Sequence, residues 1–246
     1  MLFALSLLRF HQIDALPLEF KVSQKKRLAV FGYSCLSKLL ETKREGYDHF
    51  LHLPAKKAAF ELSTINVDKQ ISALLKIFQK TKFGFAWVES EKLGGFASLR
   101  DLLNLYEDDT IKTKLRLADL ASPIFSLPGR TDIRTVVAEM FQRRIRRIFV
   151  EGTSSLVTDR RIIGHLFSPS RLEATSQKPE TLLDVRLEDL EALTPMKVQS
   201  STSAKKGAHL MREQSEECLV CEKGVVTPWD MIMKPLTLGS LKIEDQ

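Results

Sequence analysis

One pattern of apolar spacing recurs along this 246-residue chain and limits the folds that it can adopt. In the segment 204–211, apolar or small residues occur at positions i, i+3, i+4 and i+7, which predicts an amphipathic helix. Two short apolar stretches, 218–221 and 224–226, then predict two strands, and Pro228 favours the start of a second helix. With a short apolar stretch before it, this part of the chain predicts the order strand, helix, strand, strand, helix.

The same order is predicted at two earlier places in the chain. The apolar faces of the three first helices begin at Ile71, Ile133 and Ala204. The three strand-to-helix junctions are marked by Gly95, Ser155 and Gly224. Because the step from one copy to the next is nearly the same for both landmarks, the chain is predicted to contain an internal repeat.

The amino-terminal segment, about 1–45, is predicted to be a fourth and degenerate copy. Its helices and strands are expected at residues 1–10, 15–22, 28–31 and 34–40. It has no counterpart of the opening strand, Ala29 replaces the junction glycine, and Cys35 stands where the other copies place a charged residue. This copy is therefore expected to keep the layout of the repeat without its polar junction residues.

The junction sequence GVVTPWD at 224–230 resembles that of the CBS domain, a motif named after cystathionine β-synthase. CBS motifs work in pairs, and the chain is similar to the standalone tandem proteins of this kind found in archaea. The resemblance implies an α/β (α+β) fold of four tandem motifs, paired into two Bateman-type modules. The expected modules are residues 1–107, with motifs at about 1–45 and 58–107, and residues 116–236, with motifs at about 118–168 and 190–236, followed by a tail at 237–246.

The strand-to-helix junctions carry the residues from which a ligand site is expected. A helix N-terminus offers unpaired N–H groups and a partial positive charge to phosphate, and an acid one turn later can accept hydrogen bonds from ribose hydroxyls. In CBS proteins that resemble this chain, the two kinds of residue hold an adenine nucleotide, such as AMP, ADP or ATP, in the cleft between paired motifs. The resemblance implies this role for Thr227, Asp230, Ser98, Asp101 and Thr158.

A purely structural role is the alternative for the same junction residues. A hydroxyl at the N-cap and an acid at N3 form a capping box, and loss of such a cap costs about 0.5–2 kcal/mol with no ligand involved. In the third copy, Arg161 stands at the position of the acid. Because arginine cannot accept a hydrogen bond, this junction is expected either to have lost its ribose site or to face an anion.

Basic residues give the chain a net charge of +6 and an alternative function. The candidate contacts to an anion or to RNA are Arg143, Arg144, Arg146, Arg147, Arg160 and Arg161. Arginines at the end of a helix stabilise its dipole, but a basic patch also suits a phosphate backbone. The alternative is therefore a ribosome- or RNA-binding protein, similar to a dormancy or hibernation factor, in which the ligand clefts are vestigial.

No catalytic or metal site is expected from the sequence. The five histidines are scattered over different copies, and no nucleophile, acid and histidine arrangement is evident. Cys218 and Cys221 point to opposite faces of a strand, and no second cysteine pair or histidine cluster completes a zinc site. We therefore expect a non-enzymatic sensor without a required cofactor, which modulates a protein partner or forms a homodimer through its modules.

The cysteine content and the amino terminus bear on where the protein works. Three cysteines cannot form a disulfide framework, which favours a reducing compartment. The leucine-rich start at 1–10 is shorter than the roughly 18 apolar residues of a membrane-spanning helix. The expected location is the cytoplasm, without a membrane partner.

Overall fold

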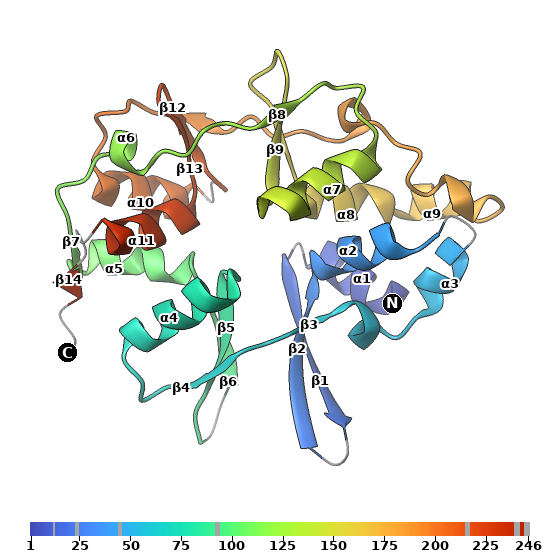
Figure 1. The fold of residues 1–246 in the computed structure, drawn as a ribbon, viewed down its shortest axis with the longest axis horizontal. Helices are drawn as coiled ribbons and strands as arrows, with labels where there is room; N and C mark the ends of the chain where they lie inside the picture. Colours follow the sequence, from blue (N-terminus) through green and yellow to red (C-terminus); the bar gives the residue numbers. More distant parts are fainter. Residues whose placement is uncertain are drawn as a thin grey trace. The chain divides into compact units, whose positions relative to one another are not determined.

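The computed structural model shows two compact units, each built from two segments that are distant in the sequence. It describes residues 1–11, 13–22, 25–43, 46–91, 94–214, 217–238 and 242–243. Unit 1 contains residues 1–62 and 125–194, and unit 2 contains residues 63–124 and 195–246 (Figure 1). Unit 1 therefore combines the first and third copies of the repeat, and unit 2 combines the second and fourth.

The first copy in unit 1 has the four elements expected from the sequence, which are α1 (Leu2–Phe10), β1 (Ala15–Val22), β2 (Lys25–Gly32) and α2 (Ser34–Glu41). Three elements that were not expected follow them: α3 (Tyr47–His52), the 3-10 turn η2 (Ala55–Ala58) and β3 (Phe60–Glu61). The strands form an antiparallel sheet in the order β1-β2-β3, with Ala15 opposite Gly32 and Ala29 opposite Glu61. The predicted lack of an opening strand is confirmed, because the third strand of this sheet follows the hairpin instead of preceding it.

The third copy in unit 1 has the complete repeat. Its elements are β8 (Ser126–Leu127), α7 (Ile133–Arg143), β9 (Arg147–Val150), β10 (Leu156–Thr158), α8 (Asp159–Leu166), α9 (Pro169–Thr175), η4 (Pro179–Thr181) and η5 (Leu187–Asp189). The opening strand β8 pairs parallel with β9, and β9 pairs antiparallel with β10. This arrangement matches the predicted order of strand, helix, strand, strand, helix.

Helix faces from the first and third copies share one apolar core in unit 1. Helices α2 and α7 are in contact, and the Tyr33 ring stacks on Phe141 with 4.2 Å between ring centroids. Arg134 of α7 donates to the Tyr47 hydroxyl at 2.6 Å and to the carbonyl oxygen of Leu40 at 3.0 Å. These contacts explain why two segments that are distant in the sequence form one unit.

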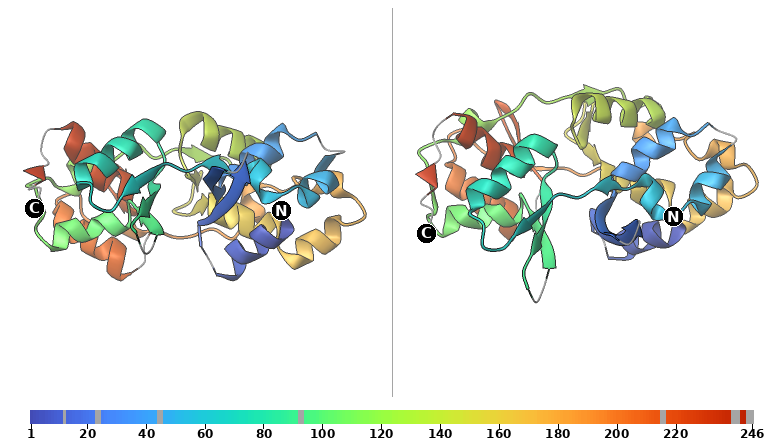
Figure 2. Two further views of the ribbon diagram at one scale, coloured as in Figure 1. Left: turned by 90° about the horizontal axis from the view of Figure 1, so that it is seen from below. Right: turned by 60° about the horizontal axis from the view of Figure 1, so that its bottom comes forward.

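Unit 2 contains two complete copies of the repeat. The second copy has β4 (Thr64–Asn66), α4 (Ile71–Thr81), β5 (Phe85–Glu89), β6 (Gly94–Ser98), η3 (Asp101–Leu103) and α5 (Asn104–Glu107), followed by β7 (Ile111–Lys112) and α6 (Leu117–Leu120). The fourth copy has β11 (Met196–Lys197), α10 (Ala204–Glu213), β12 (Leu219–Cys221), β13 (Gly224–Val226) and α11 (Pro228–Thr237), followed by β14 (Lys242–Ile243). The opening strands β4 and β11 pair parallel with β5 and β12, and each hairpin is antiparallel; the β5–β6 hairpin extends from its copy in Figure 2.

Helices of the second and fourth copies pack together in unit 2. The buried Tyr106 hydroxyl of α5 donates to the Met231 carbonyl oxygen at 2.5 Å, and Arg100 donates to that of Met211 at 2.9 Å. Residues of α4, α5, α10 and α11 contribute to one apolar core. The second and fourth copies are thus joined in the same manner as the first and third.

The expected modules, residues 1–107 and 116–236, therefore do not coincide with the compact units. Each copy buries a helix face against a copy that is not its neighbour in sequence, and the repeat period alone could not specify this choice. The expected ligand clefts between sequential copies stay a prediction. Within the part of the chain that the structure describes, no helix has the length and apolarity needed to cross a membrane.

Candidate functional site

The second copy carries a reciprocal set of hydrogen bonds at its strand-to-helix junction. Strand β6 ends at Ser98, and Asp101 begins η3 three residues later. Asp101 Oδ2 accepts from the Ser98 backbone N–H at 2.8 Å and from Ser98 Oγ at 2.7 Å, while the Asp101 N–H donates to Ser98 Oγ at 3.3 Å. The capping-box geometry anticipated for these two residues is present.

Asp101 lies at the surface and uses one carboxylate oxygen for these bonds. Its side chain is exposed, and both bonds that it accepts end on Oδ2. Among the described residues, none donates to Asp101 Oδ1 in the structure. This oxygen can therefore accept a hydrogen bond from a molecule in solution without breaking the cap.

The hairpin that carries Ser98 also carries a cluster of aromatic rings. Phe85 lies opposite Ser98 across the β5–β6 pair, and Trp87 lies opposite Phe96, so the four side chains share one face of the hairpin. The Trp87 and Phe96 rings meet edge to face, with centroids 5.7 Å apart, and all three rings are half-buried. A polar junction and an aromatic surface therefore occur side by side on this hairpin.

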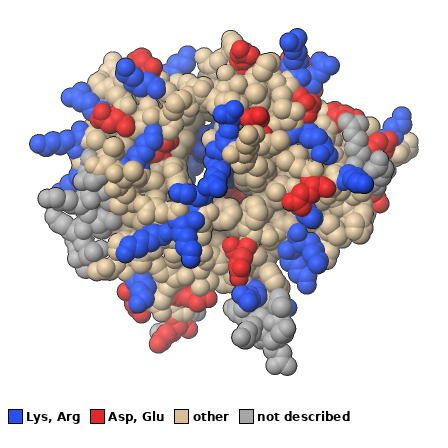
Figure 3. Space-filling model, viewed as in Figure 1, with Lys and Arg blue, Asp and Glu red and all other residues tan. Residues whose placement is uncertain are grey.

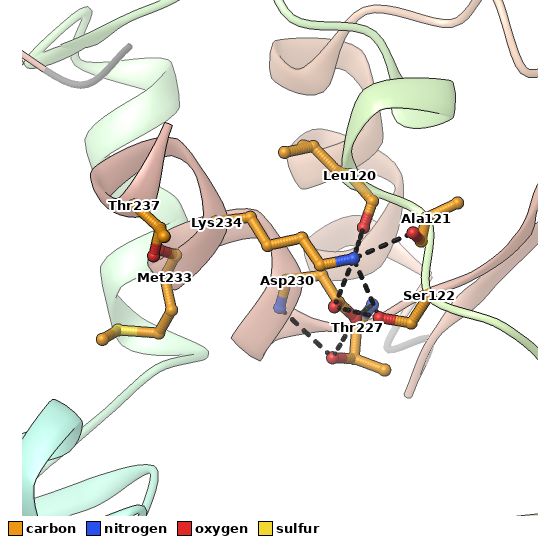
Figure 4. Close-up of polar contacts among 8 residues, drawn as sticks. All are labelled: Leu120, Ala121, Ser122, Thr227, Asp230, Met233, Lys234 and Thr237. Atoms are coloured by element: carbon orange, nitrogen blue, oxygen red, sulfur yellow. Dashed lines mark hydrogen bonds and ion pairs between the residues drawn. The ribbon is translucent and has the colours of Figure 1, made fainter. Parts of the chain in front are cut away.

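The fourth copy repeats the capping box at the start of α11. Thr227 is the N-cap, Pro228 occupies N1 and Asp230 occupies N3. Asp230 Oδ2 accepts from the Thr227 N–H at 2.9 Å and from Thr227 Oγ1 at 2.7 Å, and the Asp230 N–H donates to Thr227 Oγ1 at 3.3 Å (Figure 4). These three bonds have nearly the same lengths as their counterparts in the second copy.

Unlike Asp101, the Asp230 carboxylate is buried and both of its oxygens are engaged. The residue is 5% exposed, and Oδ1 accepts from Ser122 Oγ at 2.7 Å and lies 3.2 Å from Lys234 Nζ. Lys234 Nζ also donates to Ser122 Oγ at 2.9 Å and to the carbonyl oxygens of Leu120 at 2.7 Å and Ala121 at 2.8 Å (Figure 4). A ligand hydroxyl would have to replace one of these internal partners.

The segment around Ser122 also covers the hairpin of the fourth copy. Its N–H donates to the Val225 carbonyl oxygen at 2.8 Å, and the Val225 N–H donates back to the Ser122 carbonyl oxygen at 2.9 Å. Gly224 has φ +138°, and a β-carbon there would collide with the Ser122 carbonyl oxygen. Glycine is required at this position because the two backbones approach so closely.

The third copy differs from both, as its sequence indicated. Thr158 Oγ1 caps α8 by accepting from the Arg161 N–H at 3.3 Å. Asp159 is buried, and its carboxylate accepts from Arg146 Nε at 2.7 Å. Burial raises the pKa of Asp159, although the Arg146 guanidinium acts in the opposite direction. Asp159, which follows the capping Thr158, is thus held by an internal ion pair.

The arginines proposed to contact an anion or RNA are largely paired within unit 1. The ion pairs are Arg143 with Glu139 at 2.7 Å, Arg146 with Asp159 at 2.7 Å, Arg160 with Asp14 at 3.6 Å and Arg161 with Glu191 at 2.5 Å. Arg144 ends α7 in a left-handed conformation and is exposed, whereas Arg147 is half-buried in β9. On the face drawn in Figure 3, Lys and Arg are interspersed with Asp and Glu.

Two polar residues of the fourth junction, Ser122 and Lys234, were missed by the sequence analysis. Lys234 could have been found, because it follows Asp230 by four residues on a predicted helix and such pairs face each other. Ser122 lies 108 residues from Asp230 in the sequence and gives no local signal.

Comparisons with known proteins identify the fold. No protein-family model matches the chain, and no curated protein matches it either. The solved structure of protein MJ1225 from Methanocaldococcus jannaschii, a proposed archaeal homolog of g-AMPK, is similar with a TM-score of 0.76 at 18% sequence identity. The similarity covers 93% of this chain and 90% of that protein. The chain has a tandem CBS-domain fold.

Single-pair CBS proteins match parts of the chain. CBSX2 from Arabidopsis thaliana, solved in complex with AMP, matches 51% of this chain and 98% of its own at 14% identity and a TM-score of 0.38. CBS domain protein PAE2072 from Pyrobaculum aerophilum, also complexed with AMP, matches 50% of this chain and 95% of its own at 22% identity and a TM-score of 0.37. The predicted CBS fold is thus confirmed from the whole-chain match, whereas its ligand is a separate question.

Proposed function

We propose that this CBS protein is a non-enzymatic regulator that binds an adenine nucleotide at the second-copy junction, through Ser98 and Asp101. The observation that carries the proposal is the difference between two carboxylates in the same motif. Asp101 is exposed with Oδ1 unused by the described residues, whereas both oxygens of Asp230 are bonded internally. Of the two capping boxes, the second-copy junction can accept a ligand without losing an internal bond.

The chemistry of this junction suits a nucleoside. A carboxylate oxygen accepts hydrogen bonds from ribose hydroxyls, as acids do at other nucleotide sites. Phe85, Trp87 and Phe96 share a hairpin face with Ser98 and offer ring surfaces on which a purine base can stack. The proposed contacts are therefore Asp101 Oδ1 to the ribose and the aromatic cluster to the base.

Nucleotide binding to the wild-type protein and to matched variants tests this proposal. Calorimetric titration with AMP, ADP and ATP should show saturable binding, and Asp101→Ala should weaken it by about tenfold or more, because a hydrogen bond to a charged group is lost. Asp119→Ala is the control: Asp119 is also an exposed capping acid, accepting from the Arg116 N–H at 2.8 Å, but it lies outside the junction. Equal affinities for the two variants, or no binding by the wild type, would contradict the proposal.

Regulation requires that the nucleotide change the affinity for a second molecule. A ligand shifts a conformational equilibrium only by its difference in affinity for the two states. We therefore expect association with a protein partner, or with a second copy of the chain, to differ with and without nucleotide. Affinity capture from extract, with and without AMP, tests for a protein partner. Sedimentation of the purified protein, with and without AMP, tests for association with a second copy.

The alternative function, RNA or ribosome binding, depends on arginines that are free to meet phosphate. Four of the six candidates form internal ion pairs. Arg144 is exposed and is the candidate best placed to contact a nucleic acid. Retention of RNA with a steep salt dependence, lost on Arg144→Ala, would favour this alternative over nucleotide sensing.

A further inference from the structure

Three potential metal ligands converge on the surface of unit 2, away from the capping boxes. Glu107 is the last residue of α5, and His209 and Glu213 lie one turn apart on α10. Their ligand atoms all lie within 4.8 Å of one another, and His209 Nδ1 is 3.2 Å from Glu107 Oε1. We infer that the Glu107–His209–Glu213 cluster binds a divalent transition-metal ion of the Zn²⁺ type.

The mixed donor set points to this class of ion. An imidazole nitrogen combined with two carboxylates suits Zn²⁺, Co²⁺ or Ni²⁺, whereas Mg²⁺ and Ca²⁺ prefer oxygen ligands alone. Three protein ligands leave one position of a tetrahedral site for water. The imidazole distinguishes this cluster from the groups of acidic residues that are common on protein surfaces.

The side chains can close around an ion with small rotations. Zinc bonds of about 2.0–2.2 Å place neighbouring tetrahedral ligands about 3.3 Å apart. The distance of 3.2 Å between His209 Nδ1 and Glu107 Oε1 fits this spacing, and a carboxylate oxygen of Glu213 lies within 4.8 Å of the other two ligand atoms. The side chains of His209 and Glu107 are 56% and 34% exposed, which leaves the ion a path from solvent.

Arg212 forms an ion pair with Glu107 and therefore influences both the orientation of this carboxylate and the affinity of the site for a cation. It contacts Glu107 Oε2, while His209 contacts Oε1, so the two partners use different oxygens. A second hydrogen bond on a ligating carboxylate fixes its orientation, as partners of metal ligands commonly do. The positive charge of Arg212 opposes the bound cation, so we expect moderate affinity and no site for a monovalent ion.

A bound ion would connect two copies of the repeat. Glu107 belongs to the second copy, whereas His209 and Glu213 belong to the fourth, and both copies contribute to the core of unit 2. Because the ligands come together only in the folded unit, metal binding should stabilise it.

Metal titration of the full chain tests the inference. Zn²⁺ should bind by calorimetry with one site per chain, and Co²⁺ should give visible ligand-field absorption without a thiolate charge-transfer band. His209→Ala and Glu213→Gln should each weaken binding by about tenfold or more and remove the rise in Tm on adding Zn²⁺. His52→Ala is the control, because His52 and Asp48 form an i,i+4 pair at 3.6 Å on α3 with two candidate ligands instead of three.

The outcomes separate this inference from the proposed nucleotide site. Loss of binding in the His209 and Glu213 variants, with wild-type binding by the His52 variant, supports the metal site whatever the nucleotide titrations give. Absence of stoichiometric binding by the wild type, unchanged binding by the cluster variants, or loss in the His52 variant would overturn it.

Discussion

The second-copy and fourth-copy junctions of unit 2 contain the same capping box in different surroundings. In each, a hydroxyl residue and an acid three positions later exchange backbone and side-chain hydrogen bonds of nearly equal length. At Ser98 the box faces solvent, whereas at Thr227 the segment around Ser122 covers it. The same local motif is therefore compatible with an open junction and with a closed one.

The difference between the two junctions lies in the second carboxylate oxygen. Asp230 Oδ1 is held by Ser122 and Lys234, and Lys234 also binds the carbonyl oxygens at the end of α6. Asp101 has no such pair among the described residues. In this chain, a hydroxyl-acid motif thus predicts the geometry of a cap, whereas the availability of its acid to a ligand depends on residues from elsewhere in the chain.

The largest difference is expected when the junction glycines are replaced by alanine. Gly224→Ala forces a side chain into a left-handed conformation and against the Ser122 carbonyl oxygen, and should cost about 3 kcal/mol of unfolding free energy. Gly95 is the corresponding glycine of the second copy, and a β-carbon there meets no atom within 4 Å. Gly95→Ala should change stability by less than about 1 kcal/mol. Urea unfolding of both variants measures the difference, and similar losses would show that Ser122 does not close the fourth junction.

A smaller loss is expected from removing the cation of the closed junction. Lys234→Met leaves the Asp230 carboxylate, whose side chain is 7% exposed, without its charge partner and should cost about 2–3 kcal/mol. Lys38→Met is the matched control, since the Lys38–Glu41 pair at 2.9 Å is largely exposed and should contribute less than about 1 kcal/mol. The free energy of unfolding is measured for both variants. If Lys38→Met were as destabilising as Lys234→Met, the buried ion pair would contribute no more to stability than the exposed one.

The sequence was sufficient to predict the parts of this comparison that depend on short spacings. Apolar periodicity predicts the three complete repeats and the degenerate one. A hydroxyl residue and an acid three positions later predict both capping boxes, and Pro228 supports the prediction in one copy. Local spacing could not show that Ser122 docks on the distant Val225, or that Arg160 pairs with Asp14. It also could not show which copies share a core, because every copy offers an apolar helix face.

The smallest effect on stability is expected for Asp101→Ala, the variant that also tests the proposed nucleotide site. Asp101→Ala removes an exposed cap and should cost about 0.5–1 kcal/mol, at the low end for such residues, because solvent can replace the lost bonds. Asp230→Ala removes a buried acid, which leaves Lys234 without its ion-pair partner and the Ser122 hydroxyl without its acceptor, so its cost should be larger. Thermal unfolding of the two variants shows which of them is less stable.

If Asp101→Ala were as destabilising as Asp230→Ala, the exposed junction would have a structural role as large as that of the closed one. If it is not, a loss of nucleotide affinity in Asp101→Ala reports on the carboxylate itself and not on unfolding of the protein.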